Sequence, residues 1–291
     1  MIPQNFEYSA PTSLKEALAL IAKGDAKVLA GGMSLIPLMK LRLAAPEHVV
    51  DLSRIADLKS VHEDGKGEFP GGALHLGALA THFEIESSAL VRSKCPLLAE
   101  VASNIGDVQV RNVGTIGGST AHADPAADYP AGLMALEAKV HLTTAKGERT
   151  LPIDQFIVDA LSTALKPNEL VREIIVPVET RGTGFSYQKL AQPASGFAVV
   201  GVAARVRKSA GKVTFVRVGV TGLAGKAFRA TRVEKLLEGT SGSAADIQKA
   251  AAQAAEGVDA NTDLHASADY RRQMTKVFTA RALTQALSRA D

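Results

Sequence analysis

A run of glycines, small hydroxyl residues and carboxylates at 114–128 constrains the fold more than any other part of the chain. It reads Gly-Thr-Ile-Gly-Gly-Ser-Thr-Ala-His-Ala-Asp-Pro-Ala-Ala-Asp and separates two apolar segments. Glycine lets a backbone approach a ligand closely and adopt positive φ, so we expect this run to be a loop. A shorter run at 30–34, Ala-Gly-Gly-Met-Ser, is similar. Together they predict a pocket for a phosphate-bearing ligand, because free N–H groups and hydroxyls stabilise a pyrophosphate.

Other interpretations of the two runs stay open. A Gly-Gly pair can simply form a tight turn, and neither run has the glycine spacing of a dinucleotide fold or the Gly-Lys-Ser/Thr of a P-loop. Asp124 and Asp128 are candidates for acid–base work, but Asp124 is equally well a turn residue and Asp128 equally well the N-cap of the next helix. His122 lies in this run, and the histidines show no metal-ligand spacing. We predict no catalytic residue and no metal site on this chain.

Composition narrows the class of protein. The chain has 291 residues, of which 46% are apolar, enough for two domains. A net charge of +3 without a dense basic run, and 4% aromatic residues without Trp, argue against nucleic-acid binding. The single cysteine, Cys95, excludes an iron–sulfur cluster held by four thiolates of this chain. Without a long apolar run or a leader pattern, we expect a cytoplasmic protein with no integral membrane segment.

The hydrophobic pattern changes at Pro177. Before it, helices and strands alternate: we expect helices at 11–22, 35–43, 81–90, 96–105 and 129–136, strands at 27–30, 48–52 and 170–176, and hairpins at 60–78 and 139–151. After it, we expect an antiparallel meander at 185–190, 197–207 and 212–221, then helices at 232–237, 244–255 and 268–288. The pattern predicts an α+β chain with domains at 1–177 and 178–291, the first in lobes of about 1–57 and 58–177.

Five short motifs occur in a specific order along nearly the whole chain. They are Phe-Glu-Tyr at 6–8, Leu-Ala-Gly-Gly-Met-Ser-Leu-Ile-Pro at 29–37, Gln-Val-Arg-Asn-Val-Gly-Thr-Ile-Gly-Gly at 109–118, Asp-Pro-x-x-Asp at 124–128 and Ala-Asp-Tyr-Arg-Arg at 268–272. In this order they resemble the FAD-binding medium subunit of the molybdenum hydroxylases, the carbon monoxide dehydrogenase and xanthine dehydrogenase family. The resemblance implies a two-lobed FAD-binding domain of the PCMH type, followed by a C-terminal domain of antiparallel sheet plus helices.

The resemblance also implies which residues bind FAD. The loop at 30–36, with Ser34, would cradle the pyrophosphate, Asp128 would accept hydrogen bonds from ribityl or ribose hydroxyls, and the segment 192–197 would approach the isoalloxazine ring. The full set of implied cofactor-binding residues is Leu29, Ala30, Gly31, Gly32, Met33, Ser34, Leu35, Ile36, Ile105, Gly114, Thr115, Ile116, Gly117, Gly118, Ser119, Asp128, Val171, Lys189 and Phe197.

Three positions depart from the family pattern. Gly196 stands where an aspartate is usual, Phe197 where tyrosine or tryptophan is expected, and Met33 where histidine is usual. Members of the family oxidise carbon monoxide, purines, aldehydes or N-heteroaromatic compounds, and the resemblance selects neither a substrate nor an electron acceptor for this chain.

The resemblance implies partners as well as a cofactor. A large subunit would hold the molybdenum cofactor and a small subunit two [2Fe-2S] clusters, in a dimer of heterotrimers. The chain would pass electrons from the clusters through FAD to an external acceptor. Two alternatives stay open: a flavin-free assembly subunit of the same complex, and a self-sufficient flavin oxidoreductase.

Overall fold

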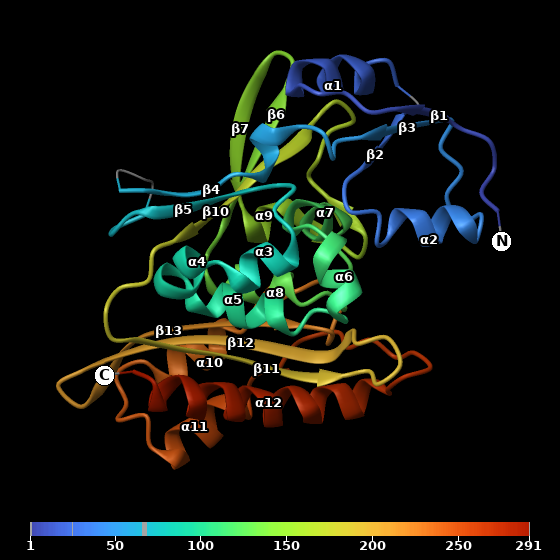
Figure 1. Cartoon of the computed structure of the whole chain (residues 1–291). Coiled ribbons are helices and arrows are strands. Elements are labelled where there is room, and N and C mark those ends of the chain that lie inside the picture. The colour runs from blue at the N-terminus through green and yellow to red at the C-terminus, as the bar shows by residue number, and fades with distance from the viewer. Residues whose placement is uncertain (1, 25, 66–68, 291) are drawn as a thin grey trace.

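The computed structural model describes residues 2–24, 26–65 and 69–290. Its elements form layers (Figure 1): a small N-terminal lobe and a five-stranded sheet lie on one side of a group of helices, and a four-stranded sheet lies on the other. A long C-terminal helix covers the far face of the four-stranded sheet. The fold therefore mixes helices and sheets, as the sequence predicts.

The N-terminal lobe is built on a parallel sheet of order β1-β3-β2. Its elements are β1 (Glu7–Ser9), α1 (Leu14–Ile21), β2 (Ala26–Leu29), α2 (Leu35–Lys40), β3 (His48–Asp51) and the 3₁₀ helix η1 (Ala56–Lys59). The Ser13 hydroxyl caps α1 by accepting from the N–H of Glu16. The strands and helices expected for this lobe are confirmed. Strand β1 was not expected, because three residues are too few to show a strand pattern in the sequence.

The second part of the chain folds around an antiparallel sheet of order β4-β5-β10-β6-β7. Its strands are β4 (Val61–Asp64), β5 (Ala73–Gly77), β6 (Lys139–Thr144), β7 (Gly147–Pro152) and β10 (Leu170–Pro177). The helices beneath it are α3 (His82–Ser87), α4 (Ala89–Lys94), α5 (Pro96–Ser103), α6 (Val108–Val113), α7 (Ile116–His122), α8 (Tyr129–Ala135) and α9 (Ile153–Phe156), with the short pair β8 (Ile157–Asp159) and β9 (Ser162–Thr163).

Two expectations for the helices were wrong. The single helix expected at 81–90 is two helices, because Ser88 has extended backbone (ψ 119°) and its hydroxyl caps the second one. The loop expected at 114–128 contains α7, which begins at Ile116. Glycine disfavours helix, but here Thr115 caps the helix and Ile116 is fully buried, so tertiary packing outweighs propensity.

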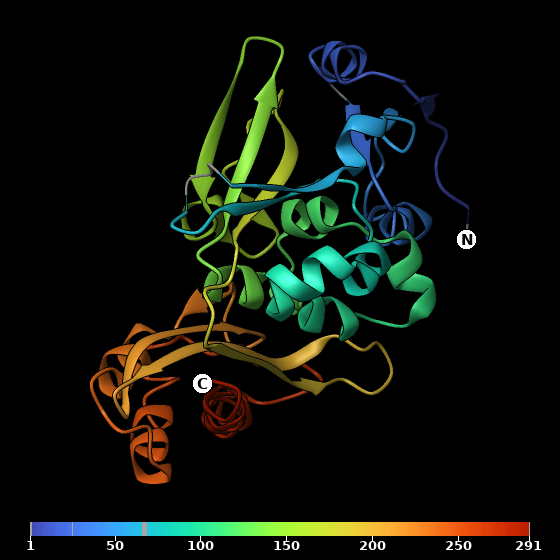
Figure 2. The same cartoon turned by 60° about the vertical axis from the view of Figure 1, so that its left-hand side comes forward.

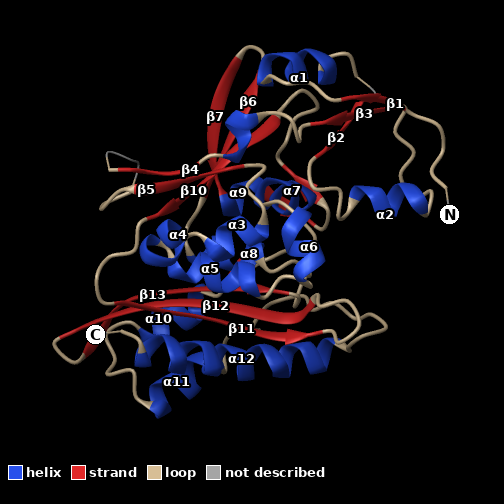
Figure 3. Ribbon diagram, in the orientation of Figure 1, coloured by secondary structure: helices blue, strands red, loops and turns tan. Residues whose placement is uncertain are grey.

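The C-terminal part is the expected antiparallel meander followed by helices. The strands β11 (Thr183–Ala191), β12 (Ala198–Ser209), β13 (Lys212–Thr221) and β14 (Phe228–Arg229) pair in that order. The helices are α10 (Thr231–Leu237), α11 (Ala244–Ala251) and α12 (Ala268–Ser288). Figure 2 shows α12 end-on beneath the sheet, and Figure 3 shows the helices α3 to α8 between the two sheets.

The core is divided by these layers. One apolar cluster lies between the five-stranded sheet and helices α5 and α8, and a second lies between the four-stranded sheet and helices α10 to α12. A third, smaller cluster holds the N-terminal lobe together and includes Leu79 and Leu170 from the second part. Within the described ranges, no helix combines the length and the apolar character needed to cross a membrane.

Candidate functional site

A cavity of about 860 Å³ opens where the N-terminal lobe, helices α6 and α7, and the turn before β12 come together. Sixteen of the nineteen residues that the sequence predicts as cofactor-binding line it: Leu29, Ala30, Gly31, Gly32, Met33, Ser34, Leu35, Ile105, Gly114, Thr115, Gly117, Gly118, Ser119, Asp128, Val171 and Phe197. Segments far apart in the sequence thus converge on one space, whose volume is in the range of small-molecule and cofactor sites.

The other three predicted residues lie just outside the lining. Ile36 packs on the Gly32 backbone, since a Cβ built on Gly32 would be 2.5 Å from its Cδ1. Ile116, the first residue of α7, is fully buried. The Lys189 side chain is 5% exposed, and its ion pair with Asp128 connects it to the cavity wall.

The loop at 31–34 lines the cavity and contains backbone donors that the protein itself does not use. In the described chain the N–H groups of Gly31, Gly32, Met33 and Ser34 have no protein acceptor. Gly32 has φ +75°, a conformation that favours glycine. Gly31 packs so closely that a Cβ there would be 2.1 Å from the carbonyl oxygen of Val113. Four free N–H groups on one loop fit an anionic group such as a pyrophosphate.

The first turn of α7 is different, because its donors are already used. The N–H groups of Ile116 and Gly117 donate to the carbonyls of Ala80 and Ala78, at 3.0 and 2.9 Å. The N–H of Gly118 donates to the Thr115 hydroxyl at 3.1 Å. This run therefore contributes shape and the Ser119 side chain to the cavity wall rather than free backbone donors.

Asp128 is held by the C-terminal sheet. Its Oδ1 accepts from the Tyr187 hydroxyl at 2.5 Å and its Oδ2 from Lys189 Nζ at 2.9 Å, and the residue is 4% exposed. Burial raises the pKa of Asp128 to about 6, although Lys189 and Tyr187 oppose the rise. Asp128 is the N-cap residue of α8 by position, but its side chain makes no capping bond to that helix.

Both carboxylate oxygens of Asp128 retain a second lone pair. The predicted role of Asp128, accepting hydrogen bonds from cofactor hydroxyls, is therefore compatible with its two protein bonds and stays a prediction.

The turn before Asp128 is fixed by local and long-range bonds. Asp124 Oδ1 accepts from the N–H of Ala126 at 2.8 Å, which is the geometry of a turn residue. The carbonyl of Pro125 accepts from the N–H of Gly222 and from the hydroxyl of Thr221, both at 2.8 Å. The structure thus favours the turn role for Asp124, and it places both Asp124 and His122 on the cavity wall.

The segment 192–197 forms a compact turn at the cavity edge. The N–H of Gln192 donates to the carbonyl of Phe197 at 2.8 Å, and its side-chain amide oxygen accepts from the N–H of Ser195. Gly196 has φ +72° and packs against Gly106. A Cβ built on Gly196 would be 3.3 Å from the Cα of Gly106. Phe197 is 47% exposed beside the cavity. An exposed aromatic ring in this place fits contact with a planar ligand.

Sequence reasoning missed several cavity residues. His82 is 4% exposed and lines the cavity from the start of α3. Leu161 lines it from the β8–β9 turn, 61% exposed and with φ +53°, where its N–H donates to the carbonyl of Ala123. Neither belongs to a motif. His82 lies within a capping box formed by Thr81 and Glu84, which fixes the start of α3 at this residue.

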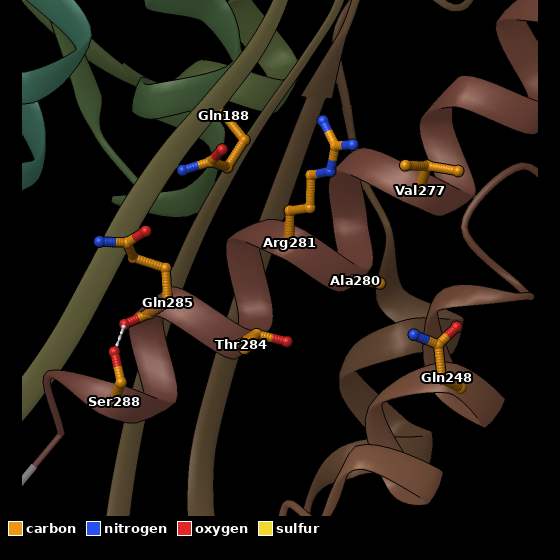
Figure 4. Close-up of a pocket in the computed structure, with 8 residues that line it drawn as sticks. All are labelled: Gln188, Gln248, Val277, Ala280, Arg281, Thr284, Gln285 and Ser288. Atoms are coloured by element: carbon orange, nitrogen blue, oxygen red, sulfur yellow. Dashed lines mark hydrogen bonds between the residues drawn. The ribbon is translucent and has the colours of Figure 1, made fainter.

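A second hollow, of about 590 Å³, lies on the C-terminal domain and shares no lining residue with the first. Figure 4 shows the residues around it: Gln188, Gln248, Val277, Ala280, Arg281, Thr284, Gln285 and Ser288. Most come from α12, with Gln188 from β11 and Gln248 from α11. Among the described residues, no group of three His, Cys, Asp or Glu side chains is placed to hold a metal ion.

Two family models match the chain. One, described as the FAD binding domain in molybdopterin dehydrogenase, matches residues 4–179. The other, described as the CO dehydrogenase flavoprotein C-terminal domain, matches residues 185–286. The two matches follow the same order as the two sheets, and the cavity receives residues from both.

Relatives match this chain over nearly its whole length. The chain is 40% identical to the carbon monoxide dehydrogenase medium chain of Hydrogenophaga pseudoflava, over 99% of each chain. It is 35% identical to the 6-hydroxypseudooxynicotine dehydrogenase complex subunit alpha of Paenarthrobacter nicotinovorans, over 100% of this chain and 97% of the relative. A solved structure of carbon monoxide dehydrogenase from Hydrogenophaga pseudoflava, which lacks the Mo-pyranopterin moiety of the molybdenum cofactor, matches with a TM-score of 0.95 at 42% identity over 100% of both chains.

Proposed function

We propose that this chain, which belongs to the FAD-binding medium subunits of the carbon monoxide dehydrogenase and xanthine dehydrogenase type of molybdenum hydroxylases, carries electrons through a bound FAD. The relatives are dehydrogenase subunits, so its class is oxidoreductase. FAD supplies the redox chemistry by accepting electrons and passing them to an external acceptor. The chain's own residues bind and orient it.

One observation carries the binding part of this proposal. The 31–34 loop has four N–H groups without an acceptor among the described residues, and it lines a cavity together with most of the predicted cofactor residues. We assign the pyrophosphate to this loop, the ribityl or ribose hydroxyls to Asp128, and the isoalloxazine ring to the neighbourhood of Phe197. The other three residues act from outside the cavity lining. Ile36 supports Gly32, Ile116 anchors α7, and Lys189 holds Asp128.

The proposal extends to partners and place. A small subunit would hold two [2Fe-2S] clusters and a large one the molybdenum cofactor, in a dimer of heterotrimers in the cytoplasm. The relatives carry names with different substrates, carbon monoxide and 6-hydroxypseudooxynicotine. We therefore assign the substrate to the large subunit and none to this chain. We place the domain boundary at 177–178 and the lobe boundary at about 57–58.

Purification of the native complex tests these assignments. We expect one FAD for each copy of this chain, iron and molybdenum in the other subunits, and a mass equal to two heterotrimers. Substrate should bleach the flavin absorbance only when the iron–sulfur subunit is present. An assembled complex without flavin would favour the assembly-subunit alternative, and activity of this chain alone would favour a self-sufficient flavin oxidoreductase. Cell fractionation tests the location.

A further inference from the structure

His82 is a buried side chain at the wall of the cavity that neither the sequence motifs nor the proposed FAD contacts use. It is the first residue of α3, and its backbone N–H donates to the carbonyl of Gly114 at 2.9 Å. A Cβ built on Gly114 would be 2.5 Å from His82 Nε2. Gly114 itself lines the cavity, so the absence of a side chain there leaves room for the imidazole edge.

The two ring nitrogens of His82 have different surroundings. Nδ1 is completely buried and has no partner in the described chain. Nε2 also has no protein partner there, but it is not among the completely buried atoms, and its residue lines the cavity. A buried N–H without an acceptor is rarer in proteins than a buried acceptor without a donor. The proton of the neutral ring therefore belongs on Nε2, where a ligand can accept it.

The surroundings keep the ring neutral. Burial, and to a smaller extent the charge of Arg111 on α6, lower the pKa of His82 to about 4. Arg111 is itself tied to Glu86 at 2.8 Å. On the α8 side, Tyr129 packs edge-on against the ring with 5.2 Å between the ring centroids, and Asp128 directly precedes Tyr129 in the chain. At neutral pH the ring thus has a single N–H.

We propose that His82 is a cofactor-binding residue whose Nε2–H donates a hydrogen bond to an acceptor atom of the molecule in the cavity. This rests on the proposed function, because FAD is the molecule assigned to that space. A neutral donor suits a carbonyl oxygen, a ring nitrogen or a phosphate oxygen. It adds a contact from α3 to the contacts already assigned to the 31–34 loop and Asp128.

Two variants test the contact. His82→Gln keeps a donor close to the Nε2 position, whereas His82→Phe keeps a flat ring of similar size without a donor. In flavin titrations of the apoprotein complex, we expect His82→Phe to raise the Kd for FAD about tenfold, equal to about 1.4 kcal/mol, and His82→Gln to raise it less than threefold. Thermal unfolding without FAD shows whether each variant folds.

A second readout does not depend on flavin. In the flavin-free chain with its seven histidines labelled with ¹⁵N, the signal absent from His82→Gln identifies His82. We expect its Nε2 to be protonated and its Nδ1 to be unprotonated, unchanged from pH 5.5 to 8. Addition of FAD should shift the Nε2 signal.

The possible failures are distinguishable. Protonation on Nδ1, or a folded His82→Phe variant that binds FAD as tightly as the wild type, would overturn the role of His82 and leave the proposed function intact. A wild-type complex that binds no FAD would overturn the proposed function, whatever the tautomer of His82.

Discussion

The two Gly-Gly runs are similar in the sequence but have different conformations and hydrogen bonds in the structure. The run at 31–34 stays a loop, its N–H groups have no acceptor among the described residues, and Gly32 has positive φ. The run at 114–119 leads into the first turn of α7, where the N–H groups of Ile116, Gly117 and Gly118 bond to Ala80, Ala78 and Thr115. The second pair of glycines therefore lets a helix pack against the protein itself, whereas we propose that the first pair serves a ligand.

The largest expected effect comes from Gly31, where the two runs touch. Gly31→Ala places a methyl group 2.1 Å from a backbone carbonyl oxygen that has no freedom to turn away. We expect a loss of about 3 kcal/mol in the free energy of unfolding and loss of bound flavin, measured by urea unfolding and flavin content.

Gly239→Ala is the control without a close contact. Gly239 has positive φ (+82°), which Gly31 does not, and no atom lies within 4 Å of its Cβ position. It should cost only about 1 kcal/mol, for backbone strain alone, and leave flavin binding unchanged. Equal losses in the two variants would mean that close contact between the two runs is unimportant.

The two glycines of α7 allow a sharper contrast. Gly117→Ala brings a methyl group 2.5 Å from the Cβ and 2.6 Å from the carbonyl oxygen of Ala78, and we expect a loss of about 2 kcal/mol in unfolding free energy. Gly118→Ala brings a methyl group 2.8 Å from the Thr115 hydroxyl and, at ordinary contact distance, 3.6 Å from the Cβ of Ala30. There the gain in helix propensity, about 1 kcal/mol, offsets damage to the cap, so stability should hardly change. The reverse order of the two variants would refute the packing role of Gly117.

The comparison extends to the side chains of Thr115 and Ser34, which stand at the N-cap positions of α7 and α2. The Thr115 hydroxyl accepts from Gly118, whereas Ser34 stands before α2 without a capping bond from its side chain. Thr115→Ala should lower the free energy of unfolding by about 1 kcal/mol, and Thr115→Ser should restore it. Thermal or urea unfolding of the flavin-free protein measures both. A Thr115→Ala variant as stable as the wild type would show that the cap contributes nothing.

Ser34→Ala should have the smallest effect on stability, less than about 0.5 kcal/mol, because no cap is lost. If its hydroxyl reaches the cofactor, the Kd for FAD should rise several-fold, since a hydrogen bond contributes about 1 kcal/mol. Flavin titration beside an unfolding curve separates the two effects. A change in stability with no change in flavin affinity would place Ser34 with Thr115 as a structural cap.

Local patterns in the sequence were sufficient to predict most of the helices and strands of the fold. Alternating and helical periodicities marked most strands and helices, because each depends on neighbours a few residues away. They failed at α7, whose first N–H groups find acceptors at Ala78 and Ala80, more than thirty residues earlier. A glycine-rich segment carries no local signal for such partners.

The same reasoning explains what was missed in the site. The resemblance placed Asp128 and Lys189 at the cofactor, but nothing nearby in the sequence pairs them with each other or with Tyr187. Residues two apart on a strand share a face, so Tyr187 and Lys189 both reach Asp128 from β11. His82 was missed because its place depends on the contact between α3 and Gly114.

The bonds between the 124–128 turn and the C-terminal sheet have a consequence for how the protein is made. Pro125, Ala126 and Asp128 find their partners on β11, β12 and just past β13. On the ribosome, the N-terminal half emerges first, with the Asp128 carboxylate and these carbonyls still without protein partners. The cavity wall is completed only after about a hundred further residues have been synthesised. We therefore expect cofactor loading to be a late event in the biogenesis of this chain, because a fragment that ends before β11 lacks these partners of the cavity wall.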